Sequence, residues 1–271
     1  MNTLNLSTAV FGAAVGAVVA LVLGLAMGLS FLVVVILEVA VIVFYIIASV
    51  TSLSGAGAEP GASGFFRGLL IGVNCALNAL LANAVWGSIL GSTVGVIFAI
   101  VLAIVNFIAV FPPVSQAGAF QVIIGWFNWL TPASWIVVGL GLVLFVLSLL
   151  GGLIGLIASS AFLKVEGLRV DAKTGTFFMK SGFVANLNFR QTAFNMGNFA
   201  FVHRNAASWH IDHEAGHSLN LGAFGSVFHF VGAIDENVPV IGGRGSNAYA
   251  ERIAESNVPG TGQSNIIPMW I

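Results

Sequence analysis

The residues most able to do chemistry in this sequence form an H-E-x-x-H motif, made of His213, Glu214 and His217. Residues four apart lie on one face of a helix, so the two imidazoles can bind a single metal ion. Glu214 projects about 100° away from His213, which places its carboxylate beside a water on the metal and not on the metal itself. Zinc bound in this way lowers the pKa of its water towards ~7, and the glutamate acts as general base. The motif therefore predicts a hydrolytic zinc centre.

Two further histidines flank this motif. His210 lies one turn before His213 and could be a fourth ligand or contact a substrate, although a polar residue near the helix start is the interpretation we favour. His229 stands between two phenylalanines, which favours a buried and hydrogen-bonded side chain. Neither residue is needed for the predicted centre.

The composition indicates an integral membrane protein of two unlike parts. The chain has 271 residues, of which 58% are hydrophobic and only 7% are charged. Residues 1–163 contain just three charged side chains, Glu38, Glu59 and Arg67, and all five histidines come later. We therefore divide the chain into a transmembrane domain, 1–163, and a polar domain, 164–271. Net charge is near zero in both parts, which argues against nucleic acid as a partner.

The apolar stretches of the first part predict a polytopic helical bundle of about five spans. About 20 helical residues cross a bilayer core. Residues 8–53 have room for two spans broken near 24–30, and residues 65–111 have room for two more broken near 87–92. Residues 134–162 form the last predicted span. The count falls to four if the first hairpin is re-entrant.

Other features of this part concern packing and placement in the membrane. Residues 119–130 are too short to span, and their tryptophans predict a segment at the membrane interface. Glu38, within a predicted span, is either a functional carboxyl or a protonated, hydrogen-bonded one. Glycines four residues apart, as at Gly12 and Gly16 or Gly68 and Gly72, predict close helix packing, either within one chain or in a homo-oligomer or larger membrane complex.

The position of the charges gives an expected location. Lys164, Arg169 and Lys173 directly follow the last predicted span, whereas most other loops lack basic residues. The positive-inside rule then places the C-terminal domain in the cytoplasm. We expect a protein of the bacterial inner membrane.

Residues 164–271 read as a small α+β domain. Residues 165–187 predict two strands joined by a turn at 171–175, in which Gly175 takes the position that needs a positive φ. Residues 194–202 alternate in polarity and predict one further strand, which precedes the motif helix. Residues 221–234 form an almost uncharged run, predicted to be buried under the sheet or to dip into the membrane surface. Residues 247–256 predict a final helix.

A strand, an H-E-x-x-H helix and a later helix with a glutamate resemble the zincin metallopeptidases, specifically the gluzincins. The resemblance covers residues 194–257 and assigns no subfamily. It implies that His213 and His217 bind Zn²⁺ together with Glu251, and that Glu255 orients a ligand histidine. Glu236 is the alternative third ligand, although it lies in a predicted turn where acids are common. The resemblance also implies that the strand at 197–202 holds an extended peptide substrate by strand addition.

Together these features predict a membrane-anchored zinc metallopeptidase that uses Glu214 to activate water. Its expected partners are the lipid bilayer and a peptide or membrane-protein substrate. The alternative is a structural or accessory subunit of a membrane complex, in which the zinc site is structural or degenerate. Catalytic sites keep one coordination position open and structural sites close it with a fourth side chain, so the ligand set discriminates the two.

Overall fold

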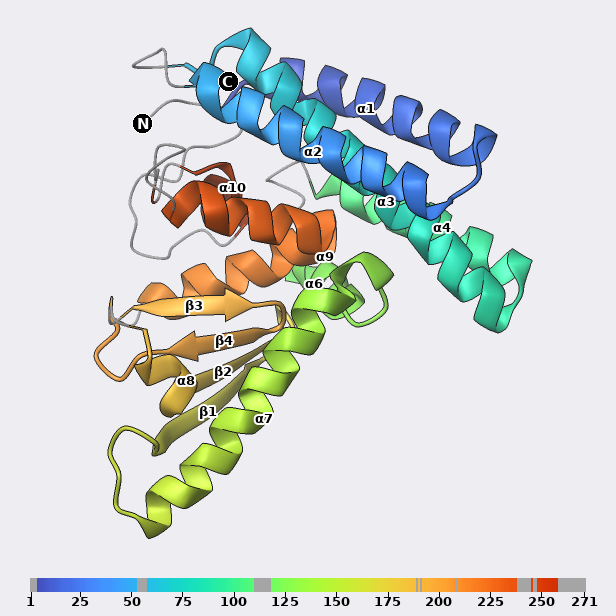
Figure 1. Cartoon of the computed structure of the whole chain (residues 1–271). Helices are drawn as coiled ribbons and strands as arrows, with labels where there is room; N and C mark the ends of the chain where they lie inside the picture. The colour runs from blue at the N-terminus through green and yellow to red at the C-terminus, as the bar shows by residue number, and fades with distance from the viewer. Residues whose placement is uncertain are drawn as a thin grey trace.

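A computed structural model describes residues 4–52, 58–109, 118–188, 190, 192–207, 209–237, 245 and 248–257. Figure 1 shows two groups of elements, a bundle of helices α1–α4 and a sheet with helices on both sides. Helix α10 lies between these groups, next to α2 on one side and α9 on the other (Figure 1).

The bundle consists of α1 (Leu6–Ala26), α2 (Phe31–Thr51), α3 (Gly61–Leu90) and α4 (Ser92–Ile108). Its breaks fall where the sequence predicts them. Ser30 caps α2 by accepting a hydrogen bond from the Val33 N–H, and Gly91, at φ +99°, separates α3 from α4. Helix α3 is the central element, because it packs against α1, α2, α4 and α9.

Four of the described helices are long and apolar enough to cross a membrane, which indicates a membrane protein: α1, α2, α3 and the helix 132–157. The predicted fifth span is α4, which is apolar but has only 17 residues. At 1.5 Å per residue it is about 26 Å long, shorter than a hydrocarbon core of about 30 Å. Among the described helices this measure therefore supports four of the about five predicted spans. The first hairpin is not the reason, since α1 and α2 both have full length.

The glycine repeats bring α1 and α3 together within the chain. A Cβ on Gly68 would lie 2.0 Å from the carbonyl oxygen of Ala9, and a Cβ on Gly16 would lie 2.4 Å from that of Leu69. Backbones can approach this closely only where side chains are absent. Of the two predicted roles, these glycines therefore serve packing within one chain. Glu38 is half-buried on α2, and its Oε2 has no hydrogen-bond partner among the described residues.

A short helix and a long one lead to the sheet. Helix α6 (Gly118–Phe127) is the predicted short segment, and the Trp126 Nε1 donates to the carbonyl oxygen of Ala172. A 3₁₀ turn, η2 (Pro132–Ser134), precedes α7 (Trp135–Ile157). Helix α7 packs on the sheet and leaves an apolar face exposed, including Leu140, Leu147 and Ile154.

The sheet is formed by β1 (Val165–Asp171), β2 (Thr176–Ser181), β3 (Ala193–Met196) and β4 (Phe199–Val202), with the short helix α8 (Phe183–Asn186) after β2. The strand order is β1-β2-β4-β3. Strands β2 and β4 are parallel, and the other pairs are antiparallel. The predicted hairpin is confirmed for residues 165–181, with Gly175 at φ +65°, but the last part of the predicted stretch is wrong, since residues 183–186 form α8. The predicted single strand at 194–202 is wrong, because Gly197, at φ +76°, turns the chain into a β3–β4 hairpin.

Strand β4 shows that the sheet is the middle of three layers. Phe199 and Phe201 pack into a cluster with Val137 and Val138 of α7. Ala200 and Val202, which point to the opposite face, pack with Ala215 of α9. One side of the sheet is thus covered by a candidate membrane span and the other by the helix with the H-E-x-x-H motif.

Helix α9 (Trp209–Asn237) consists of two helical segments joined at Gly225, whose backbone is not helical (φ +81°, ψ −179°). The apolar run 221–234 therefore contains the end of the motif helix and most of the second segment. Phe224 and Phe228 are buried in a core that also contains Tyr45 of α2 and Tyr249 of α10 (Tyr249–Asn257). This core crosses the boundary predicted at residue 163.

Candidate metal centre

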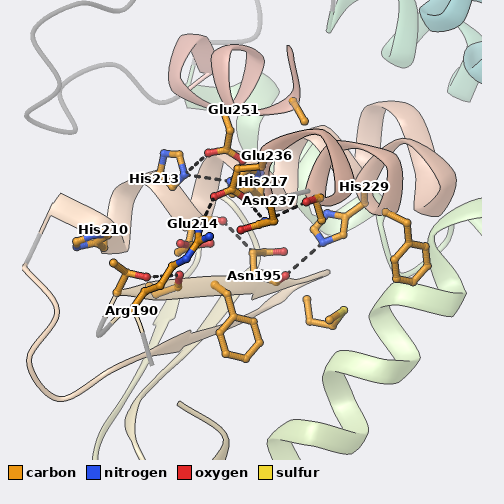
Figure 2. Close-up of a pocket in the computed structure, with 17 residues that line it drawn as sticks. Arg190, Asn195, His210, His213, Glu214, His217, His229, Glu236, Asn237 and Glu251 are labelled. Carbon is orange, nitrogen blue, oxygen red and sulfur yellow. Dashed lines mark hydrogen bonds and ion pairs between the residues drawn. The ribbon is translucent and has the colours of Figure 1, made fainter. Parts of the chain in front are cut away.

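Three predicted ligands meet at one point, although they come from two helices. The Nε2 atoms of His213 and His217 are 3.1 Å apart. Glu251 Oε2 lies 2.9 Å from His213 Nε2, and Glu251 Oε1 lies 3.2 Å from His217 Nε2. Figure 2 shows the two histidines on α9 turned toward Glu251, which reaches down from α10. These residues are the one group of metal-binding side chains that the described part of the chain brings together.

The distances within this group fit a zinc ion. A tetrahedral zinc ion with bonds of about 2.0–2.1 Å sets its ligand atoms about 3.3 Å apart. The three observed separations, 2.9–3.2 Å, are close to that value. Two imidazole nitrogens and one carboxylate are also a ligand set found in catalytic zinc sites, which keep a further position for water or substrate.

The close approach of α10 to α9 depends on the glycine inside the motif. A Cβ on Gly216 would lie 2.4 Å from the carbonyl oxygen of Ala254, so only glycine leaves room for α10 here. One turn further along α9, Asn220 Nδ2 donates to the carbonyl oxygen of Ala250 at 2.8 Å. These two contacts lie on either side of His217 on α9 and of Glu251 on α10, and they bring Glu251 within reach of both histidines.

Charge and burial shape the protonation of the ligands. Burial opposes the ionised form of Glu251, but the two imidazoles outweigh it and hold the pKa of this carboxyl well below its usual range. For His217, burial works against the cation, and the Glu251 carboxylate more than compensates, so the pKa is raised. Glu251 is thus an anion facing two imidazoles, which is an electrostatic environment suited to a cation.

Glu214 faces a cavity of about 360 Å³ that the ligands also line. Its side chain is 4% exposed, and burial raises its pKa above the ordinary value against the opposing influence of the two histidines. The cavity is bordered by β3, from Ala193 to Met196, and by the second part of α9 at Phe230 and Ala233. The predicted base and the predicted ligands therefore share one cavity.

The structure places the other candidate ligands, Glu236 and His210, outside the three-residue group. Glu236 lines the same cavity, where its Oε1 is 3.8 Å from the exposed Arg190 guanidinium, but it is not part of the three-residue group. His210 is also outside that group, and its Nδ1 lies 3.1 Å from the carbonyl oxygen of Ala207. The side chain of Glu255 lies outside the described residues, so its predicted role stays a prediction.

His229 is half-buried and hydrogen-bonded, whereas the sequence predicts a buried side chain. Its Nε2 lies 3.2 Å from the backbone carbonyl of Asn195, and burial together with nearby His217 lowers its pKa to about 4. His229 is therefore neutral at physiological pH and donates from Nε2. It also lines the cavity, 6.3 Å from His217 between ring centroids.

Asn195 is a site residue that the sequence analysis missed. Its Nδ2 donates to the Glu214 backbone carbonyl at 2.9 Å and to Ser218 Oγ at 3.0 Å. These bonds fix the motif helix to β3 at the position of the predicted base. Asparagine is unfavourable in strands, so its presence among apolar residues just before the motif was the available signal.

A comparison with protein-family models found no match, and comparisons with curated proteins and with solved structures likewise found none. The resemblance to gluzincins therefore rests on the motif and on the residues described above.

Proposed function

We propose that this chain is a membrane-bound zinc metallopeptidase, with the centre formed by His213, His217 and Glu251. The observation that carries the proposal is the convergence of these three side chains at the wall of a cavity that also contains Glu214. A closed structural site would need a fourth protein ligand, and the described residues supply three.

Each residue has a distinct role in the proposed reaction. When bound, zinc supplies a Lewis acid and a water whose pKa is lowered towards ~7. Glu214 takes the proton of the attacking water, and its raised pKa brings it closer to the operating pH of a general base. Asn195 holds the backbone of Glu214 against β3, so the carboxylate stays fixed relative to the cavity.

The proposed substrate is a polypeptide bound in extended form along β3. This strand lines the cavity and stands at the end of the sheet order, where its outer edge can pair with a peptide. The strand that the sequence analysis assigned to this role is β4 in the structure, and β4 is paired on both sides by β2 and β3. The substrate-binding strand in this proposal is therefore β3.

The arrangement around the sheet favours a substrate close to the membrane. A Cβ on Gly141 of α7 would lie 2.0 Å from the Met196 carbonyl oxygen, so α7 runs directly against the end of β3. Met196 also lines the cavity. Helix α7 belongs to a candidate span and exposes an apolar face on the side away from the sheet. The cavity is therefore about one layer of structure, ~10 Å, from this span. Peptides and membrane-protein segments at the bilayer surface are the substrates that this geometry favours.

The test compares the wild-type chain with Glu214→Gln, each purified in detergent and supplied with zinc. We expect one zinc ion per chain in both proteins, and hydrolysis of a quenched fluorescent peptide library by the wild type alone. A wild-type chain that binds zinc and cleaves no peptide, even in lipid vesicles, would refute the peptidase and support the structural or accessory subunit. A wild-type chain that binds no zinc would refute the proposed metal centre itself.

A further inference from the structure

A buried polar network joins the helix that carries Glu251 to the membrane bundle. The Tyr249 hydroxyl, at the start of α10, is 2.9 Å from Glu59 Oε1 and 2.9 Å from the carbonyl oxygen of Ala48 on α2. Glu59 is in turn paired with Arg67 of α3 at 3.1 Å, and both side chains are fully buried. The bundle thus presents two fixed acceptors to a single hydroxyl of α10.

Glu59 is held firmly enough to act as an anchor. Its Oε2 accepts from the backbone N–H of Asn5 at 2.7 Å and from Arg67 Nη2 at 3.1 Å, and its Oε1 accepts from Arg67 Nε at 3.3 Å. A buried carboxylate with this many donors has little freedom to move, because every displacement leaves a buried polar group unpaired. The position of the Tyr249 hydroxyl is therefore set by α1, α2 and α3 together.

Tyr249 and Glu251 lie on opposite faces of the same helical turn. Residues two apart in an α-helix project about 200° from each other. In α10 this places the Tyr249 ring against Tyr45 of α2, with ring centroids 6.1 Å apart, while Glu251 points to the histidines of α9. A shift or rotation of α10 that moves one of these side chains must therefore move the other.

We propose that Tyr249 is a positioning residue for the metal centre. Its hydrogen bonds to the membrane bundle hold α10 in place and so fix the position of the proposed ligand Glu251. The close contact at Gly216 sets how near α10 lies to α9, and the Tyr249 hydroxyl sets its rotation and its position along α9. The inference rests on the proposed metal centre. It adds that the membrane bundle takes part in forming that centre and does more than attach it to the bilayer.

The experiment measures zinc affinity of the full-length chain in detergent, by competition with a chelating dye, for wild type, Tyr249→Phe and Tyr45→Phe. Tyr45 is the matched control. It is as buried as Tyr249, and its hydroxyl also lies 2.9 Å from a carboxylate, in this case Asp235 near the end of α9. Both changes delete one buried hydroxyl at the same interface. The Tyr45 hydroxyl also meets the backbone of Ala250 on α10, but only Tyr249 is itself on the turn that carries Glu251 and joins that turn to Glu59.

We expect Tyr249→Phe to weaken zinc binding on the order of tenfold, as loss of a group that orients a ligand does. We expect Tyr45→Phe to weaken zinc binding clearly less than Tyr249→Phe does. The Co²⁺-substituted proteins give a second readout, because the visible bands of Co²⁺ follow ligand geometry: they should shift more in Tyr249→Phe than in Tyr45→Phe. Equal zinc affinity and equal Co²⁺ spectra in all three proteins would overturn the proposal, and equal losses in both variants would show a general effect of stability.

A further variant keeps the proposal testable if Tyr249→Phe does not fold. The double variant Glu59→Gln with Arg67→Met removes both buried charges together, a change that is often tolerated, and leaves Tyr249 a neutral acceptor. It should weaken zinc binding less than tenfold and shift the Co²⁺ bands in the same direction. A folded double variant with wild-type affinity and spectrum would overturn the role of this network. Failure of the wild type to bind zinc would instead refute the proposed function.

Discussion

Gly216 offers a quantitative test of how the candidate centre is assembled. In Gly216→Ala the new Cβ would lie 2.4 Å from the Ala254 carbonyl oxygen, whereas ordinary van der Waals contact begins at 3.4 Å. Backbone atoms cannot rotate away, so α9 and α10 have to separate by about 1 Å. The distance from His213 Nε2 to Glu251 Oε2 would then grow from 2.9 Å to about 3.9 Å.

Such a separation is too wide for three ligands around one zinc ion, whose tetrahedral arrangement needs about 3.3 Å. We therefore expect zinc affinity to fall on the order of 10–100-fold. Overpacking should also cost about 1–3 kcal/mol of stability, partly offset by up to about 1 kcal/mol from the better helix propensity of alanine. Chelator competition measures the first effect, and thermal unfolding of the metal-free protein in detergent measures the second.

Gly139→Ala is the control for the same chemical change. Gly139 lies within α7, and a Cβ there would meet nothing within 4 Å. This variant should bind zinc as the wild type does, with unchanged or slightly higher stability. If Gly216→Ala folds and retains wild-type zinc affinity, then the approach of α10 at Gly216 does not govern the ligand geometry, and the reasoning is wrong.

The other predictions concern single groups. Glu214→Gln should abolish hydrolysis while zinc stays bound, measured by peptide cleavage beside elemental analysis; loss of the metal would contradict its role as base and not ligand. Glu251→Ala should strongly lower zinc affinity in a chelator titration, whereas Glu236→Ala should leave it unchanged, and the reverse result would make Glu236 the third ligand. Glu59→Gln should destabilise the folded chain by about 3–5 kcal/mol, because it leaves Arg67 charged and buried without its carboxylate. Unfolding by denaturant in mixed micelles would check this, and a loss below about 1 kcal/mol would show that Arg67 finds another partner.

The helical spacing of the motif predicted that His213 and His217 share a face, and the resemblance to gluzincins added Glu251; the structure brings these three side chains together. The β3–β4 hairpin was not predicted, although the apolar residues change phase at Gly197: Phe194 and Met196 lie before the turn, and Phe199 and Phe201 follow it. The run 221–234 was predicted as a segment of its own, and the structure divides it at Gly225 between the end of the motif helix and a second helical segment. A short apolar run has no periodicity that fixes such a boundary.

Contacts between distant residues were beyond the reach of a single sequence. In the sequence, Glu59 and Arg67 are two of the three charged residues of the apolar part, with nothing to pair them. Their meeting with Tyr249, 190 residues after Glu59, follows only from the way α10 docks on the bundle. Hydropathy reports which solvent a segment prefers, and it contains no information about which buried groups are paired.

Two buried carboxylates explain why the polar and apolar parts of the chain are packed as one unit. Glu59, from the apolar part, accepts a hydrogen bond from Tyr249 of the polar part. Asp235, from the polar part, accepts from Tyr45 at 2.9 Å and from Ser49 at 3.4 Å, both in the apolar part. Burying a carboxylate without hydrogen-bond donors costs free energy of folding. Each part of the chain supplies donors to a buried carboxylate of the other part, and this lowers that cost. Separation of the two parts would remove a donor from both acids and would also release α10, the helix that carries the third ligand. The candidate centre therefore depends on how α10 docks on the bundle, and changes in the bundle that disturb this docking should affect metal binding.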